Sequence, residues 1–188
     1  MTDFTLHTAE TAPEAAKPLI EASQKRYGML PNLHATLAES PETYEAYGAL
    51  QGLFGKTSLG TVEKHVVLIA INVDNRCHYC VPAHSFLALK DGVSEETVAA
   101  LREDRALPDA RLEALRQFTK ALIANRGHLA DAEVAAFLAA GFTKQNVFEV
   151  ILASAYKTIS NYTNHLARTP VDPPFQKYAW SEATAAAE

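Results

Sequence analysis

Apolar residues recur every three or four positions through most of the chain, which is the spacing of an amphipathic α-helix. The clearest example lies between Asp109 and Gly127, where an N-cap residue precedes the stripe and a glycine ends it. Its apolar members are Leu112, Leu115, Phe118, Leu122 and Ile123. Similar patterns predict helices over 11–28, 40–55, 58–75, 77–91, 94–103, 131–141 and 143–169. Since no β-hairpin signal separates two alternating runs, the sequence predicts an all-α fold of seven or eight helices.

Two segments complicate this pattern. Pro18 falls inside the first predicted helix, so that helix is expected to be bent or split. The run Val66–Ile71 is continuous and rich in β-branched residues, which is equally typical of a buried strand. A strand leading into a Cys-x-x-Cys pair is the thioredoxin arrangement. Because the Ala- and Leu-rich remainder supplies no further strands, we predict a central helix that is apolar on all sides.

Length, composition and charge narrow the class of protein. The chain has 188 residues, of which 48% are apolar, so we expect residues 1–188 to form one domain with a substantial core. A net charge of −5 disfavours nucleic acid and anionic membrane surfaces as partners. The longest apolar run is too short to span a membrane, and Met1–Glu10 lacks the basic and apolar segments of a secretory leader. We therefore expect a cytoplasmic protein.

The two cysteines, Cys77 and Cys80, are the most informative residues in the composition. In a reducing compartment, so close a pair is more often redox-active or metal-binding than structural. On a helix, at about 100° per residue, Cys77, Cys80 and His84 share one face. Pro82 is tolerated only in the first turn, so this helix is expected to begin at 77–79. Both thiols would then lie at a helix N-terminus, where the macrodipole favours the thiolate.

The stretch VEKHVVLIAINVDNRCHYCVPAHSFLAL, within a core motif of about residues 58–92, resembles the alkylhydroperoxidase D (AhpD)-like, peroxidase-related members of the carboxymuconolactone decarboxylase-like superfamily. An apolar helix followed by Cys-x-x-Cys-x-x-x-His is more specific than a lone Cys-x-x-Cys pair. The resemblance implies an AhpD-like all-α domain that assembles as a homo-oligomer. It also implies a thiol peroxidase with antioxidant function that uses an external dithiol reductant and no bound cofactor.

The same resemblance assigns roles to three residues. Cys80 is implied to attack the hydroperoxide, Cys77 to resolve the sulfenic acid as a disulfide, and His84 to help deprotonate Cys80. This agrees with thiol chemistry, because the thiolate is the nucleophile and a sulfenic acid condenses readily with a neighbouring thiol.

The sequence departs from the family pattern at two places. The glutamate of the family's proton relay corresponds here to His65, and the nearest carboxylate, Glu63, is two residues earlier. Two residues turn a helix by about 200°, so the two side chains cannot simply replace one another, and either Glu63 or His65 is expected to complete the relay. AhpD itself has a histidine directly before the second cysteine, where this chain has Tyr79.

Other function classes stay open. Cys77, Cys80 and His84 could hold a zinc ion with His78, His65 or His165 as a fourth ligand, although only one chelating pair is clear. A redox sensor or interaction module without peroxidase turnover is the other alternative.

Weaker candidate sites lie outside the motif. Tyr79, Asn161 and His165 are weak candidates for substrate binding, and a buried polar patch or a subunit contact explains the segment Ser160–His165 more simply. Residues 170–188, which are rich in proline and aromatic residues, predict an irregular arm lying on its own domain or on a neighbouring subunit.

Overall fold

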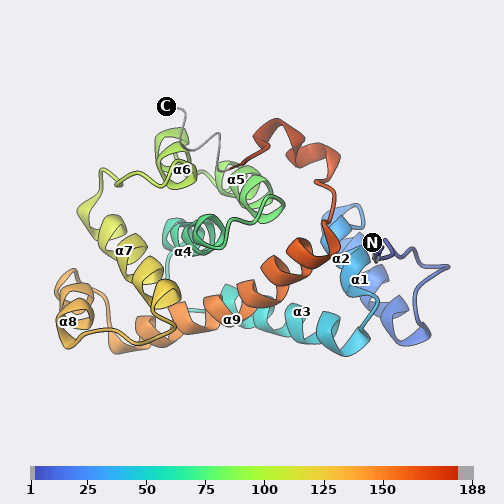
Figure 1. Cartoon of the computed structure of the whole chain (residues 1–188), viewed down its shortest axis with the longest axis horizontal. Coiled ribbons are helices and arrows are strands. Elements are labelled where there is room, and N and C mark those ends of the chain that lie inside the picture. Colours follow the sequence, from blue (N-terminus) through green and yellow to red (C-terminus); the bar gives the residue numbers. More distant parts are fainter. Residues whose placement is uncertain (1–2, 182–188) are drawn as a thin grey trace.

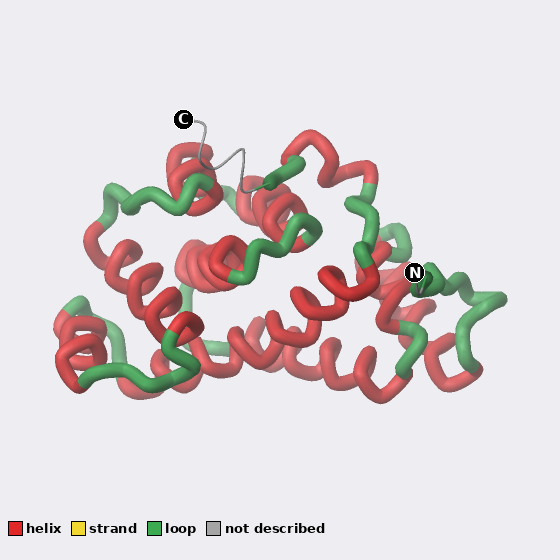
Figure 2. Tube along the Cα trace, viewed as in Figure 1, coloured by secondary structure: helices red, strands yellow, loops and turns green. Residues whose placement is uncertain are grey.

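The computed structural model describes residues 3–181, and every regular element in that range is a helix (Figures 1 and 2). The α-helices are α1 (Lys17–Tyr27), α2 (Asn32–Leu37), α3 (Pro41–Gly55), α4 (Thr61–Asp74), α5 (Cys80–Lys90), α6 (Glu95–Arg102), α7 (Ala110–Ala124), α8 (Asp131–Ala139) and α9 (Lys144–Ala167). Two 3-10 helices, η1 (Glu14–Ala16) and η2 (Pro173–Tyr178), flank them. The all-α prediction is confirmed, although the short helix α2 was not anticipated.

Helix α4 is the centre of the molecule. It packs against α5, α6, α7 and α9, and Figure 1 shows it end-on between these helices. Nine consecutive residues, 65–73, are buried. The run Val66–Ile71 is therefore apolar on all sides because neighbours surround this helix, and it does not form a strand.

The first predicted helix is split, as its proline implied. Residues Glu14–Ala16 form η1, and α1 starts at Lys17, which places Pro18 in the first turn where its missing N–H costs no hydrogen bond. Gly28 ends α1 with a φ of 73°, a left-handed conformation that glycine adopts without steric cost. No described helix is long and apolar enough to cross a lipid bilayer.

The C-terminal arm packs on its own chain as far as it is described. η2 lies on α5, where the Phe175 ring contacts Tyr79 and Phe86. The indole Nε1 of Trp180 donates to the carbonyl of Arg102, 2.9 Å away. Residues 182–188 of the predicted arm lie outside the described residues.

Candidate active site around Cys80

The two cysteines lie where the end of α4 meets the start of α5. Arg76 has a left-handed φ of 55° and turns the chain, so that the amide of Cys77 donates to the carbonyl of Asn72 at 2.9 Å. Cys80 is the first residue of α5, and its amide donates to Cys77 Sγ at 3.3 Å. Both residues are free thiols and buried. The helix thus begins three residues later than its expected earliest start, and Cys77 precedes it.

The two thiols differ in acidity. Burial by itself raises the pKa of Cys80, but the Cys77 thiol, the Lys157 ammonium and the Asn164 and Asn161 amides outweigh it and lower that pKa to about 5. The hydrogen bond that Cys77 donates to Cys80, together with burial, raises the pKa of Cys77. The expectation of two acidic thiols is thus wrong for Cys77, because one proton shared between two sulfurs stabilises only one thiolate.

A buried lysine supplies the positive charge near Cys80. Lys157 of α9 is 1% exposed, and its Nζ lies 3.0 Å from Nε2 of His84. None of the ion pairs among the described residues includes Lys157. A buried ammonium needs a counter-charge. The Cys80 thiolate is the anion that meets this need.

Asparagine amides from α4 and α9 hold the sulfur and its surroundings. Asn164 Nδ2 donates to Cys80 Sγ at 3.2 Å. Asn161 Nδ2 donates to Asn72 Oδ1 at 3.0 Å, and Asn161 Oδ1 accepts from Asn75 at 2.9 Å. Asn72 in turn donates to the carbonyl of Cys80 at 3.4 Å. This buried network joins three helices around the thiol and fixes its position.

His84 faces Lys157. Burial and the Lys157 charge hold the pKa of His84 well below its usual range, so the imidazole is neutral. Since its Nε2 accepts from the Lys157 ammonium, its proton is on Nδ1, which is buried without a partner among the described residues. His84 is therefore placed to exchange a proton with Lys157.

Glu63 and His65 lie at the other end of α4. The Glu63 carboxylate accepts from the amide of Gly60 at 2.7 Å and pairs with Arg111, so it caps the helix and does not contact the thiols. His65 Nε2 lies 2.9 Å from the Asp91 carboxylate, at the end of α5. His65 also contributes to the low pKa of His84 and has a buried, unpartnered Nδ1. Of the two relay candidates, the structure brings only His65 towards His84.

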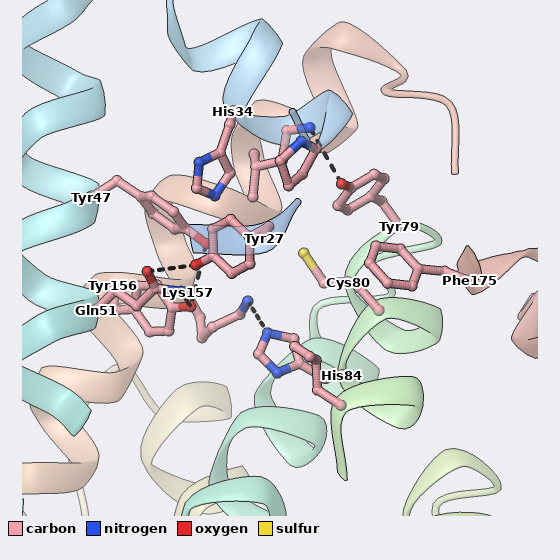
Figure 3. A pocket seen from close by; sticks show the side chains of 14 residues that line it. Tyr27, His34, Tyr47, Gln51, Tyr79, Cys80, His84, Tyr156, Lys157 and Phe175 are labelled. Atoms are coloured by element: carbon pink, nitrogen blue, oxygen red, sulfur yellow. Dashed lines mark hydrogen bonds between the residues drawn. The ribbon is translucent and has the colours of Figure 1, made fainter. Parts of the chain in front are cut away.

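A pocket opens beside the Cys80 sulfur (Figure 3). Aromatic residues from four parts of the chain line it together with Cys80, His84 and Lys157. These are Tyr27, His34, Tyr47, Tyr79, Tyr156 and Phe175. The cysteine is therefore buried on the protein side and still faces a space that a small molecule can enter.

Residues 41–121 match the model of the carboxymuconolactone decarboxylase family. An uncharacterized peroxidase-related protein from Ralstonia eutropha JMP134, with an alkylhydroperoxidase AhpD core, is 21% identical and has a TM-score of 0.81 over 92% of this chain and 93% of that chain. The chain belongs to the AhpD-like, carboxymuconolactone decarboxylase-like superfamily.

Further solved structures share the fold of this AhpD-like chain. An uncharacterized peroxidase-related protein from Silicibacter sp. TM1040 has a TM-score of 0.78 at 17% identity, over 93% of this chain and 92% of that chain. The debrominase Bmp8, in complex with 2,3,4-tribromopyrrole, has a TM-score of 0.78 at 18% identity, over 94% and 95%. No curated protein matches the sequence significantly.

The remaining candidates of the AhpD-like chain take different places. Tyr79 lines the pocket and donates to the buried Asp172 carboxylate. Asn161 belongs to the buried amide network, whereas His165 is exposed. His78 Nε2 contacts the carbonyl of Thr169 at 3.0 Å. Within residues 3–181, no three His, Cys, Asp or Glu side chains are placed to share a metal ion.

Sequence reasoning missed Lys157 and Asn164. Both lie on the buried face of α9, seven residues apart with Ser160 and Asn161 between them. Polar residues at this helical spacing, within the stripe that also holds Ala153 and Tyr156, are the signal that identifies them. A lysine on a core-facing stripe is itself an indication of a charge-stabilising role.

Proposed function

We propose that this protein is a thiol-dependent peroxidase that reduces hydroperoxides through a Cys77–Cys80 dithiol/disulfide couple. One observation carries the proposal: the buried Cys80 sulfur has a pKa lowered to about 5 and faces the pocket, and the neighbouring Cys77 thiol keeps its proton. This pairs a nucleophile with a proton-bearing thiol that can resolve the oxidised product.

The oxidising half-reaction is balanced by residues of the site. The Cys80 thiolate attacks the terminal oxygen of the hydroperoxide, the S–O bond forms, and the O–O bond breaks. Cys80 becomes a sulfenic acid, and the alkoxide takes a proton from the Lys157 ammonium to leave as an alcohol. Solvent restores the Lys157 proton through neutral His84, which lies 3.0 Å away.

Cys77 completes the turnover. Its sulfur attacks Cys80, the S–S bond forms, and the hydroxyl group leaves with the Cys77 proton as water. The sum is one hydroperoxide and two thiols converted to an alcohol, water and a disulfide. An external dithiol then reduces the disulfide by exchange, so we expect no bound cofactor. We place this homo-oligomeric antioxidant enzyme in the reducing cytoplasm.

The test is consumption of tert-butyl hydroperoxide by the purified protein, with a dihydrolipoamide-type dithiol as reductant. Wild type is compared with Cys80→Ser and His84→Ala. We expect turnover by wild type, none by Cys80→Ser, and slower turnover by His84→Ala. Full activity of Cys80→Ser would show that the peroxidatic role is misassigned.

Reductive dehalogenation is a second candidate, favoured by the aromatic pocket beside an acidic thiol and by the fold shared with a debrominase. In that reaction, two thiols and a bromoarene give a disulfide, the hydrogenated arene and hydrogen bromide. Bromide release from 2,3,4-tribromopyrrole with the same reductant separates it from peroxide reduction. If neither reaction turns over, free-thiol titration with metal analysis distinguishes a redox sensor from a zinc protein.

A further inference from the structure

The pocket above Cys80 has two aromatic walls. In Figure 3, the Tyr27, Tyr47 and Tyr156 side chains lie on one side of the Cys80 sulfur, and Tyr79 and Phe175 lie on the other. The first wall comes from the N-terminal helices and α9, and the second from the Cys-x-x-Cys loop and η2. A flat group entering this space meets rings on both sides.

Ring contacts hold each wall in place. In the first wall, His34 packs edge-on against Tyr27 at 5.3 Å and Tyr47 at 5.6 Å between centroids, and Tyr47 lies 5.1 Å from Tyr156. In the second wall, Phe175 packs edge-on against Tyr79 at 6.5 Å. These separations are those of favourable aromatic pairs, so the walls do not need a ligand to become ordered.

The walls are uncharged at neutral pH. Burial raises the pKa values of Tyr27 and Tyr79, raises that of Tyr47 far above its usual range, and lowers that of His34 to about 4. The Lys157 ammonium and the Cys80 thiolate cancel one another. A neutral ligand preserves this balance, whereas an anionic ligand adds a buried charge without a partner.

One phenolic hydrogen is left over for a ligand. Tyr27 donates to Gln51 Oε1 at 3.1 Å, and Gln51 Nε2 donates to the Tyr156 oxygen at 3.2 Å. The Tyr47 and Tyr156 oxygens are 3.3 Å apart, and this contact uses one of their two hydrogens. The other has no acceptor among the described residues and can donate to an oxygen atom of a ligand in the pocket.

We infer that the preferred substrates are uncharged hydroperoxides that carry an aromatic ring, and not hydrogen peroxide or anionic hydroperoxides. This inference rests on the proposed peroxidase function. The ring lies between the two walls, and the spare phenolic hydrogen binds a substrate oxygen. The thiolate attacks the terminal oxygen, and the aromatic alcohol leaves after taking the Lys157 proton, as for any hydroperoxide.

A matched substrate pair tests the inference. Cumene hydroperoxide differs from tert-butyl hydroperoxide by a phenyl group in place of a methyl group. We expect kcat/KM to be at least about tenfold higher for the cumene compound, because the extra ring is buried against aromatic walls. Phe175→Leu is expected to lower this ratio several-fold, whereas Phe148→Leu, at a side chain that is 70% exposed, leaves it unchanged.

A binding measurement separates the inference from the function on which it rests. In a Cys77→Ser background, 2-phenyl-2-propanol is expected to protect Cys80 from iodoacetamide, and tert-butanol is not. If no hydroperoxide is turned over but 2-phenyl-2-propanol protects Cys80, the peroxidase function fails and the aromatic preference stands. Equal kcat/KM values for both hydroperoxides, with no protection, would overturn the aromatic preference while peroxidase function stands.

Discussion

The two ends of the α4–α5 helix pair carry ionisable residues in very different settings. At the cysteine end, α4 finishes and α5 begins, and Cys80 is buried with Lys157 and Asn164 around its sulfur. At the far end, Glu63 pairs with Arg111, and His65 pairs with Asp91, whose side chain is 51% exposed. Charges at the cysteine end lack water and depend on one another, whereas those at the far end are partly solvated. Substitutions should therefore have large effects at the first end and small effects at the second.

Cys80→Ser should have the largest effect. A serine hydroxyl is not ionised at neutral pH and is a far weaker nucleophile than a thiolate, so hydroperoxide turnover should fall on the order of 1000-fold or more. Turnover is measured by peroxide consumption with a dithiol. A substantial residual rate would show that the reactive group lies elsewhere than at the cysteine end.

Cys77→Ser should stop turnover but not the first chemical step. Without the resolving thiol, one equivalent of hydroperoxide should leave Cys80 as a sulfenic acid, which dimedone labels. Mass spectrometry of the labelled peptide provides the measurement. If peroxide treatment gives no label, the binding-module alternatives gain over an enzyme.

Lys157→Met should raise the pKa of Cys80, because it removes the ammonium that stabilises the thiolate. In wild type the thiolate predominates at pH 7 and is lost as pH falls through about 5, so alkylation by iodoacetamide should slow below that pH. In the variant the midpoint should move upward by about one to three pH units. The rate of sulfenic acid formation at pH 7 should fall about tenfold or more.

Lys144→Met provides the matched control, since Lys144 is exposed at the start of the same helix. It should leave the alkylation midpoint at its wild-type value. An unchanged midpoint in Lys157→Met would mean that Cys77 and the amides alone account for the acidity of Cys80.

Asp91→Asn should have a modest effect. It keeps the shape of the His65 partner but removes its charge, so His65 becomes a weaker proton acceptor. We expect kcat to fall by no more than about fivefold, with the pKa of Cys80 unaltered. A loss as large as that of Lys157→Met would extend the essential machinery to the far end.

Glu63→Gln should have the smallest effect on activity. Its carboxylate caps α4 and pairs with the half-exposed Arg111, so the loss of charge should cost about 1 kcal/mol of stability or less. Peroxide turnover should stay within about twofold of wild type. Thermal unfolding and turnover are measured together, and a turnover defect without a change in Tm would restore Glu63 as a relay candidate.

Much of the fold was predictable because local patterns encode it. The caps and stop glycines placed most helices, and Pro18 correctly indicated a split in the first. The short helix α2 was missed because its six residues span less than two turns and give no periodic stripe. The start of α5 was predicted too early because Cys77 Sγ accepts the amide of Cys80, a contact that no pattern encodes.

The candidate site was only partly predictable. Cys77, Cys80 and His84 lie close in sequence, so helical geometry was enough to bring them to one region. Lys157 and Asn164 come from a helix more than 70 residues later, and their distance from Cys80 depends on how α9 packs against α4 and α5. The choice between His65 and Glu63 likewise required the tertiary structure, since Arg111 engages Glu63 from another helix.

The sequence by itself determined the helical class of this protein, its superfamily motif and the pairing of two cysteines with a histidine, because periodicity and short-range spacing are local properties. Only the tertiary structure decided which sulfur is acidic, which relay residue lies near His84, and what the pocket wall is made of. The pKa of a buried thiol depends on charges and donors within a few ångströms, and packing brings these from helices far apart in the chain.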